Sequence, residues 1–438
     1  MATYDILFKN IKTVLPSGIQ TLTVGLKDGK IASLNASEDD SATTVIEGAG
    51  KHLIPGVIDS QVHFREPGLT HKEDLETGSL AAVCGGVTTF LEMPNTNPST
   101  TTAQAITHKV ELAKSKSHTN FGFFMGATGE NLDELLKVPN LEGCCGIKIF
   151  LGSSTGDLLL YNEEKLLEIF KATNSVIAVH SENEEMLKAN KHIQQEAKDV
   201  HAHYQWRDVE TAYSSTIKII EIAKKAGRKV HVLHITSKKE IEFLAQNKEH
   251  CTVEVTPQHL TLFAPEIYDE IGTYAQMNPP IRTKENTDAL WVGLENGTVD
   301  VIGSDHAPHT KEEKDQGYPK SPSGMPGVQT MLPVMLDQVN KGRLSLEKCV
   351  QLLCENPAKL YGLEKKGRIA EGLDADLTVI ELDKSYEVKD EDMKSKVGWT
   401  PFRGRTFTGW PHMTIISGKI VAKDGNLVDK EFKGSPIN

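Results

Sequence analysis

Residues 56–68 read Gly56-Val57-Ile58-Asp59-Ser60-Gln61-Val62-His63-Phe64-Arg65-Glu66-Pro67-Gly68. The apolar segment at the start of this stretch gives way to an acid, a histidine and an arginine, and a Pro-Gly turn follows. The pattern is typical of a buried β-strand that delivers polar side chains to its own carboxyl end. Within a pocket, these side chains can hold a metal ion and an anion side by side.

Length and charge exclude several classes of protein. The chain has 438 residues, of which 60 are acidic and 48 are basic, so its net charge is −12. This balance argues against nucleic-acid binding, which needs a basic surface. No apolar run approaches the roughly 18 residues of a membrane span, and the N-terminus lacks the pattern of a signal peptide. Because the six cysteines form no CxxC pair and are too sparse for a disulfide scaffold, we expect a protein of the reducing cytoplasm.

The middle of the chain alternates apolar strands with helical segments. Because the strands show little polar alternation, they are predicted to be parallel and buried on both faces. The clearest helix lies over 208–227, with apolar residues at three- and four-residue spacing before a glycine. Eight such units predict a (β/α)8 TIM-like barrel, whereas a doubly wound open sheet fits less well because no Gly-rich phosphate turn follows the first strand. The predicted strands are 53–64, 87–94, 120–127, 145–151, 176–180, 229–236, 252–256 and 299–306.

The two ends of the chain differ from the middle. Both are strand-like, and they contain the pairs Asp28-Gly29 and Asp424-Gly425, which are typical of hairpin turns. We predict a small β-sandwich domain formed by both termini, with the barrel inserted into it. The terminal domain comprises residues 1–52 and 363–438, and the barrel comprises residues 53–362.

Five polar residues fall at or near the carboxyl ends of the predicted strands, namely His63, Lys148, His180, His234 and Asp305. Active sites of such barrels gather at that end, so residues far apart in sequence can converge there. Each residue alone has an ordinary structural explanation, such as a hydrogen-bonded histidine, a helix cap or a lysine that reaches solvent. Together they indicate a metal centre, because imidazole nitrogens suit zinc.

Lys148 lies within an apolar run, Ile147-Lys148-Ile149-Phe150. An unpaired ammonium group is unfavourable in such a place, and burial lowers the pKa of a lysine. A neutral lysine amine can react with CO2 to form a carbamate, which is an anionic ligand with two oxygen atoms. Two divalent ions could share this carbamate together with a hydroxide.

Six segments resemble the amidohydrolase superfamily of metal-dependent barrels, and most closely its dihydroorotase branch. The resemblance extends over nearly the whole chain, including the split β-domain, and the segments follow the family's order. Many bacterial relatives have an aspartate in place of the bridging lysine, and this chain resembles the lysine-bearing branch. The segments are VHFREPG at 62–68, MPNTNP at 93–98, GIKIF at 146–150, HVLH at 231–234, MNPPIR at 277–282 and SDHAPHT at 304–310.

The resemblance implies a role for each candidate residue. His63 and Asp305 would bind a more buried zinc ion, His180 and His234 would bind a more exposed one, and Lys148, carboxylated on its side-chain nitrogen, would bridge the two. Asp305 would also be the general base and acid. The residues implied to bind the substrate, through its carboxylate or its ring amides, are Arg65, Asn95, Asn278, His309, Ser323 and Gly324.

One position departs from the family pattern. The family normally has His-x-His at the end of the first strand, and this chain has Gln61-Val62-His63. A glutamine amide oxygen is a poor zinc ligand compared with imidazole. Three protein ligands and a water still form a catalytic zinc site. We therefore predict one or two zinc ions per chain, at two positions of unequal affinity.

The resemblance implies dihydroorotase activity, the reversible hydrolysis of the cyclic amide of (S)-dihydroorotate to N-carbamoyl-L-aspartate in pyrimidine biosynthesis. Two alternatives are a related cyclic amidohydrolase, such as an allantoinase or hydantoinase, and a non-catalytic scaffold for a transcarbamoylase. Arg65 favours the first function, because a planar guanidinium matches a carboxylate with two hydrogen bonds. The resemblance also implies a homodimer and association with a transcarbamoylase.

Overall fold

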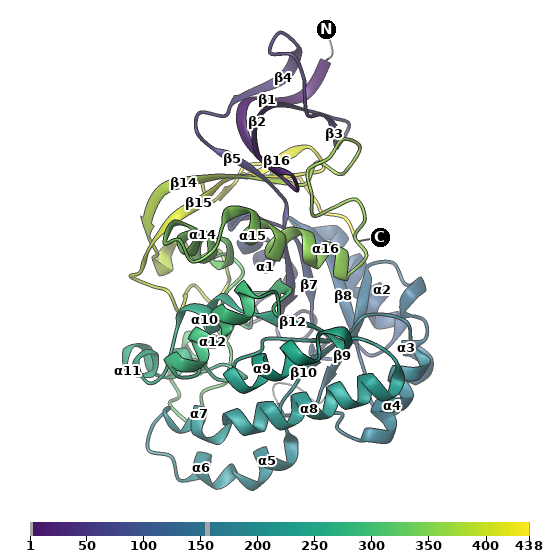
Figure 1. The fold of residues 1–438 in the computed structure, drawn as a ribbon, viewed down its shortest axis with the longest axis vertical. Helices are drawn as coiled ribbons and strands as arrows, with labels where there is room; N and C mark the ends of the chain where they lie inside the picture. The colour runs from purple at the N-terminus through teal and green to yellow at the C-terminus, as the bar shows by residue number, and fades with distance from the viewer. Residues whose placement is uncertain (1–2, 154–157, 438) are drawn as a thin grey trace.

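Two β-sheets organise the chain in the computed structural model, which describes residues 3–153 and 158–437 (Figure 1). Residues 1–2 and 438, at the outer limits of the predicted terminal domain, lie outside the described residues. The larger unit is an eight-stranded parallel sheet in which the strands follow one another in sequence order. Its strands are β6 (Val57–Val62), β7 (Val87–Glu92), β8 (Asn120–Gly126), β9 (Cys144–Phe150), β10 (Ile177–His180), β11 (Val230–Val232), β12 (Cys251–Val255) and β13 (Val301–Ile302).

The parallel sheet curves into a nearly closed barrel, as the sequence predicted. A bridge between Val62 and His306 joins the first strand to the segment after the last one, and the backbone N–H of His63 donates to the carbonyl oxygen of His306 at 2.7 Å. Every residue of β6, β7 and β8 is buried. This burial on both faces explains why these strands show apolar runs without polar alternation.

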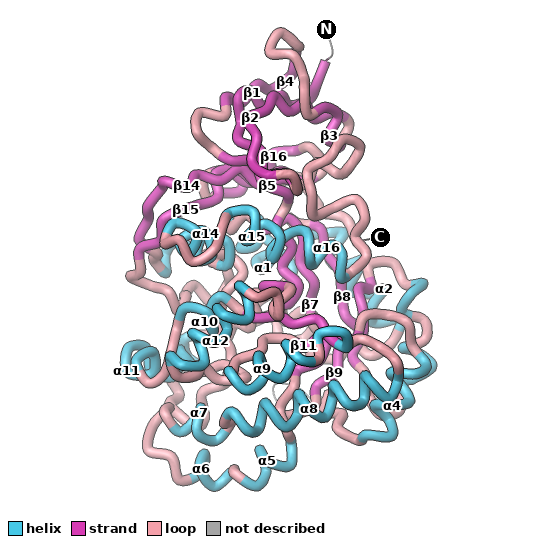
Figure 2. Tube along the Cα trace, in the orientation of Figure 1, coloured by secondary structure: helices cyan, strands magenta, loops and turns pink. Residues whose placement is uncertain are grey.

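Helices cover the outside of the barrel strands (Figure 2). The longest, α8 (Val209–Ala226), begins at Asp208, whose side chain accepts from the N–H of Thr211, and ends at Gly227 with φ 67°. The other α-helices are α1 (Leu75–Cys84), α2 (Ala103–Lys116), α3 (Leu132–Leu135), α4 (Glu163–Ala172), α5 (Glu184–Ala189), α6 (Lys191–Gln195), α7 (Ala202–Trp206), α9 (Lys238–Gln246), α10 (Pro257–Thr261), α11 (Glu266–Ile271), α12 (Lys284–Glu295), α13 (Lys311–Lys314), α14 (Met331–Asn340), α15 (Leu346–Val350) and α16 (Asn356–Leu360). Shorter 3-10 turns are η1 (Val138–Asn140), η2 (Lys248–His250), η3 (Gly272–Ala275) and η5 (Asp390–Asp392), and η4 (Gln351–Glu355) is a π-helical turn.

The second sheet combines strands from both ends of the chain and lies apart from the barrel strands, at the top of Figure 1. Its strands are β1 (Thr3–Leu15), β2 (Gly18–Lys27), β3 (Lys30–Ser33), β4 (Ser41–Glu47), β5 (His52–Pro55), β14 (Leu377–Glu387), β15 (Thr406–Ile416), β16 (Lys419–Lys423) and β17 (Asn426–Leu427). Antiparallel pairing of β5 with β14 joins the N-terminal part to the C-terminal part. Apolar side chains from both parts, such as Phe8, Leu377 and Ile415, form its core. The predicted terminal β-domain is therefore present.

The first predicted strand differs from the structure in one respect. The single strand expected over 53–64 is divided at Gly56 into β5, which belongs to the terminal sheet, and β6, which begins the barrel. Gly56 donates its N–H to the carbonyl oxygen of Asp376 at 2.8 Å, and a Cβ at this position would overlap the side chain of Thr88. This close approach allows the chain to pass from one sheet to the other.

Two further strands are shorter than predicted. The strand expected over 229–236 is β11 (Val230–Val232), and that expected over 299–306 is β13 (Val301–Ile302). Beyond these strand ends, His234 and Asp305 adopt positive φ angles of 37° and 45°, which are not β-strand conformations. Within residues 3–153 and 158–437, no helix combines the length and the apolar character needed to cross a membrane.

Candidate active site

The predicted metal ligands come from five strands and lie at the carboxyl end of the barrel. His63 directly follows β6, Lys148 lies within β9, His180 ends β10, and His234 and Asp305 follow β11 and β13. A small cavity of about 20 Å³, which is room for about one water molecule, separates their side chains. It is lined by Gln61, His63, Lys148, Phe150, His180, His234, Asn278, Asp305, Ala307, Ser323 and Gly324.

The histidines and the aspartate form two pairs. His63 Nε2 lies 3.2 Å from Asp305 Oδ1, and His180 Nδ1 lies 3.1 Å from His234 Nε2. Among the described residues, no three of these four groups bring their ligand atoms within 4.8 Å of one another. Burial lowers the pKa of all three histidines. They are therefore neutral at pH 7 and retain the lone pairs that a metal ion needs.

Lys148 is buried and its ammonium group has no hydrogen-bond partner among the described residues. Its Nζ lies 4.6 Å from the centre of the Phe150 ring. Burial lowers the pKa of Lys148 to about 7, although the carboxylates of Asp305 and Glu254 act in the opposite direction. A large fraction of this amine is thus uncharged near neutral pH, which is the form that reacts with CO2.

A carboxylate that the sequence reasoning missed fixes the orientation of His180. Glu182 Oε2 lies 2.8 Å from His180 Nε2, and the guanidinium of Arg207 donates to the same carboxylate. Although burial acts to raise it, the pKa of Glu182 is held well below its usual range by Arg207 and His180. This contact directs His180 Nδ1 toward His234, and such support is usual for metal-binding histidines. The spacing His180-Ser181-Glu182 was the available signal.

Asn95, predicted to contact the substrate, does not line the cavity. Its Oδ1 lies 2.7 Å from Nδ1 of His63. The amide oxygen can only accept a hydrogen bond, so His63 carries its proton on Nδ1 and presents Nε2 to Asp305. The structure therefore places Asn95 where it orients a predicted metal ligand.

Arg65 is buried beside this cluster, with 2% of its surface exposed and φ 66°. Its Nε donates to the carbonyl oxygen of Pro308 at 3.3 Å. Among residues 3–153 and 158–437, no acidic side chain forms an ion pair with it. Glu66, the acid next to it in sequence, instead pairs with Lys116 at 2.9 Å. Burial lowers the pKa of Arg65 to about 10, against the effect of nearby Asp305.

His309 lies between Arg65 and the loop that carries Ser323. Its Nε2 is 3.0 Å from the carbonyl oxygen of Ser323 and 3.3 Å from Nη2 of Arg65, and Nζ of Lys72 lies 3.1 Å from its Nδ1. The carbonyl of Ser323 requires a proton on Nε2, and Lys72 then donates to Nδ1. Nε2 consequently cannot accept from Arg65. The guanidinium keeps donors available for another acceptor.

Asn278, Ser323 and Gly324 form another part of the cavity wall. Oδ1 of Asn278 is buried and has no hydrogen-bond partner among the described residues. Gly324 has φ 142°, and a Cβ there would lie 2.9 Å from the His309 ring. A side chain at position 324 is thus excluded both by backbone conformation and by space.

Gln61 lies in the same cavity, at the His63–Asp305 pair. Its Nε2 donates to Asp305 Oδ1 at 3.0 Å, and its Oε1 has no partner within the described part of the chain. Three residues of this site, Arg65, His234 and Asp305, have positive φ angles without being glycine. Such conformations are unfavourable and cluster at functional sites.

Three other buried histidines of the barrel have structural partners. His259 donates to the carbonyl oxygen of Pro279 through Nε2 at 3.0 Å. Nδ1 of His306 accepts from the N–H of Gly327 at 3.0 Å. His231 faces Thr252, with its Nδ1 2.8 Å from the hydroxyl oxygen. None of the three lines the cavity.

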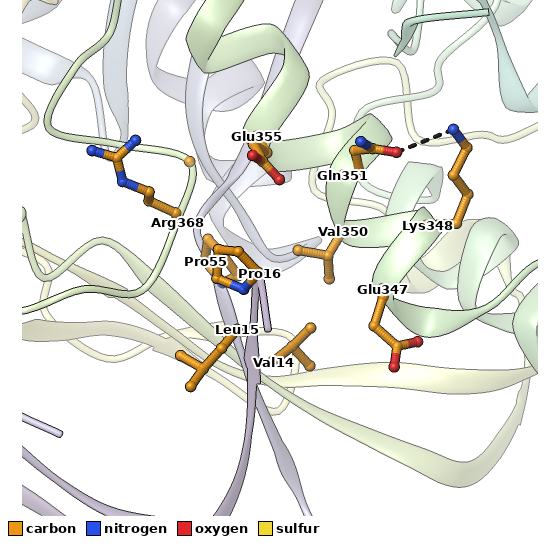
Figure 3. Close-up of a pocket in the computed structure, with 11 residues that line it drawn as sticks. Val14, Leu15, Pro16, Pro55, Glu347, Lys348, Val350, Gln351, Glu355 and Arg368 are labelled. Carbon is orange, nitrogen blue, oxygen red and sulfur yellow. Dashed lines mark hydrogen bonds between the residues drawn. The ribbon is translucent and has the colours of Figure 1, made fainter. Parts of the chain in front are cut away.

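A second cavity, of about 260 Å³, lies at the opposite end of the barrel (Figure 3). It borders Pro55, which precedes the first barrel strand, and its rim carries charges of both signs on Glu347, Lys348 and Arg368. Lys348 donates to Gln351 at 3.1 Å. This cavity contains none of the predicted site residues.

Comparison with known proteins agrees with this geometry. Residues 52–421 match the model of the amidohydrolase family. The chain belongs to the amidohydrolase family. Members of this family generally bind divalent metal ions.

Relatives of this amidohydrolase include enzymes for two cyclic amides. An L-hydantoinase from Paenarthrobacter aurescens is 35% identical, and the alignment covers 98% of this chain and 97% of the relative. A dihydroorotase from Methanosarcina mazei is 34% identical, with coverage of 98% and 97%. The solved structure of an L-hydantoinase (dihydropyrimidinase) from Arthrobacter aurescens has a TM-score of 0.93 at 34% identity, and 97% of each chain is covered. This amidohydrolase is therefore an enzyme that hydrolyses a cyclic amide.

Proposed function

We propose that this amidohydrolase is a zinc-dependent dihydroorotase that interconverts (S)-dihydroorotate and N-carbamoyl-L-aspartate. The observation that carries the proposal is the buried guanidinium of Arg65, which has no acidic partner among the described residues. A buried charge without a counter-ion is strongly unfavourable, and the carboxylate of a bound substrate would supply one. Dihydroorotate carries a carboxylate on its ring, whereas the hydantoin ring has none.

The side chains at the cavity fit a divalent metal centre. The two pairs, His63 with Asp305 and His180 with His234, would each hold one metal position, and carboxylated Lys148 would bridge them. The support is the unpartnered Nζ of Lys148 beside neutral imidazoles and a carboxylate, a donor set that suits zinc. Zinc bound there would supply Lewis acidity and lower the pKa of a bound water to about 7.

Each remaining residue has a chemical task in the hydrolysis of the ring. The attacking water forms a bond to the ring carbonyl carbon, and the bond from that carbon to the ring nitrogen breaks. Asp305 would accept the proton of the water and deliver it to the departing nitrogen. Arg65 and Asn278 would hold the carboxylate, and the loop of Ser323 and Gly324, supported by His309, would hold the ring amides.

Substrate choice tests the proposal directly. With purified, zinc-loaded protein, the ultraviolet absorbance of dihydroorotate should change in both directions of the reaction. We expect kcat/KM for dihydroorotate to exceed that for an uncharged 5-substituted hydantoin by at least about 100-fold, because the neutral ring leaves Arg65 unpaired. Equal or faster hydrolysis of the hydantoin would instead assign a hydantoinase activity, the function named for one relative.

Replacing Arg65 with lysine should weaken substrate binding selectively. A guanidinium grips a carboxylate with two hydrogen bonds, and an ammonium group offers only a point charge. We expect KM for dihydroorotate to rise about 30-fold, equivalent to about 2 kcal/mol, with kcat changed much less. Steady-state kinetics at constant metal content measures both. An unchanged KM would remove Arg65 from the carboxylate site and with it the main support for dihydroorotase activity.

Gln61 predicts metal positions of unequal affinity. An amide group that donates to Asp305 at 3.0 Å replaces the imidazole that would complete the buried position. Dialysis against a weak chelator should therefore remove one equivalent of metal before the other, as measured by mass spectrometry of bound metal. Gln61→His should raise the tightly held metal toward two equivalents. Two equivalents retained by the unchanged protein would show that Gln61 does not weaken the site.

Four expectations from the sequence stay predictions. They are the homodimer, the association with a transcarbamoylase, the place in pyrimidine biosynthesis and the cytoplasmic location. The proposal does not depend on them, since all the residues named for binding and hydrolysis lie within one chain.

A further inference from the structure

Lys314 is a fully buried lysine outside the metal cluster. It is the last residue of α13 and has no exposed surface. Its ammonium group donates to three backbone carbonyl oxygens, those of Gln276 at 3.3 Å, Pro322 at 2.8 Å and Gly324 at 3.1 Å. Burial lowers the pKa of Lys314 to about 7. In the ammonium form, each of its three N–H donors has a main-chain acceptor.

These three carbonyls belong to the two segments that build the cavity wall. Pro322 and Gly324 flank Ser323, and Gln276 lies two residues before Asn278. The segments are also bonded to each other, since Gly324 N–H donates to the carbonyl oxygen of Gln276 at 2.8 Å and Nε2 of Gln276 donates to Ser323 Oγ at 3.0 Å. The ammonium group of Lys314 therefore lies behind the wall, at the point where its two halves meet.

The side chain of Lys314 has no acidic partner in the described part of the chain that would account for a buried lysine at this position. No acidic side chain among the described residues forms an ion pair with it. Its other contact is the ring of Trp399, 6.0 Å away, whose Nε1 donates to the carbonyl oxygen of His309 at 2.8 Å. A buried charge held only by carbonyl dipoles is costly relative to an apolar side chain of the same size. Stability alone does not call for a lysine here.

We propose that Lys314 is a positioning residue that sets the backbone of Pro322–Gly324 and Gln276–Asn278 at the distance that the substrate ring requires. The inference rests on the proposed function, because it assigns these segments to the ring amides and the carboxylate. Lys314 itself does not line the cavity. It would act through the carbonyls that it holds, because loss of these hydrogen bonds would let the wall shift away from the substrate.

The test compares Lys314→Met with a matched variant. Arg228 also holds backbone carbonyls, those of Phe170, Thr173 and Ser175, but these precede β10 and lie at the opposite end of the barrel. For Lys314→Met we expect KM for dihydroorotate to rise at least about tenfold, with kcat within about threefold and the zinc content unchanged. For Arg228→Met we expect a lower melting temperature and an unchanged KM. Lys314→Gln, which keeps two donors, should give an intermediate KM.

The outcomes distinguish a failure of the proposed dihydroorotase activity from a failure of the positioning role of Lys314. If the unchanged protein does not turn over dihydroorotate, the proposed function fails before any variant is compared. If it does, and Lys314→Met has the KM of the unchanged protein, Lys314 does not position the wall. A rise of KM in Arg228→Met equal to that in Lys314→Met would show a general effect of loosened packing. If neither Lys314 variant folds, the lysine is a structural residue and the inference is overturned.

Discussion

Asp305→Asn is expected to lower kcat by about 10³-fold or more while the protein stays folded. General acid–base catalysis alone contributes about 10²- to 10⁴-fold, and this residue would also lose its negative charge as a metal ligand. An amide cannot accept the proton of the attacking water or return it to the ring nitrogen. The fold should tolerate the change because the amide oxygen of the new side chain can still accept from Gln61, whose Nε2 lies 3.0 Å from Asp305 Oδ1.

The control for this prediction is Asp337→Asn. Asp337 is also a buried acid, but it lies on α14 and pairs with Lys341 at 2.6 Å and with the N–H of Thr408 at 3.2 Å. Its loss should lower the melting temperature and leave kcat unchanged. Single-turnover kinetics with equal metal loading compares the two variants. A kcat for Asp305→Asn within tenfold of the unchanged protein would assign the proton transfer to another group.

The barrel could be predicted from sequence because its signal is local. A strand buried on both faces is mostly apolar. A polar residue at the end of such a strand, such as His63 or His180, can therefore be recognised in the sequence. Parallel strands in one barrel bring their carboxyl ends to the same side, so the convergence of residues from β6, β9 and β10 followed from topology. The positive φ angles of His234 and Asp305 lie beyond the ends of their strands, and no such signal for them is present in the sequence.

The partners of the site residues were harder to predict, for a physical reason. Hydrogen bonds between side chains depend on atomic positions that packing fixes only after the whole barrel has closed. Asn95 was expected to meet the substrate, and the structure places it on His63. Glu182 was not singled out, although it lies only two residues after His180. The sequence does not show that its carboxylate reaches His180, or that Arg207 donates to the same carboxylate. Sequence patterns identify candidate metal ligands more readily than the groups that orient them.

The family relationship identifies the type of reaction, the hydrolysis of a cyclic amide, but it does not identify which cyclic amide is the substrate. A dihydroorotase and an L-hydantoinase are similarly close to this chain, so overall likeness does not separate their rings. The distinction depends on a few side chains that contact the part of the substrate away from the scissile amide. Under the proposed function Arg65 is one of these side chains, and a carboxylated ring would supply the acidic partner that Arg65 lacks among the described residues.

Lys148→Met should have two effects of opposite sign. The variant should lose most of its bound metal and lower turnover by about 10³-fold or more, because a thioether cannot form the carbamate that would join the two metal positions. The metal-free variant should nevertheless be more stable than the metal-free unchanged protein by about 1–3 kcal/mol, which is the usual cost of a buried polar group without a partner. Lys148 Nζ is such a group among the described residues, and methionine has a similar length.

Lys109→Met provides the contrast that makes this prediction specific. Lys109 is equally buried, but its Nζ lies 2.7 Å from Glu92, so its removal leaves a buried carboxylate without its partner and should destabilise the protein by about 3–5 kcal/mol. Urea unfolding of both chelator-treated variants measures the two stabilities, and mass spectrometry measures the bound metal. If Lys148→Met were instead the less stable metal-free protein, or bound metal normally, Lys148 would be serving the fold. The two substitutions are thus expected to change the stability of the metal-free protein in opposite directions. The difference follows from the partners of the two lysines, since Lys109 has an acid within reach, whereas Lys148 lies where a carbamate and metal ions would bind.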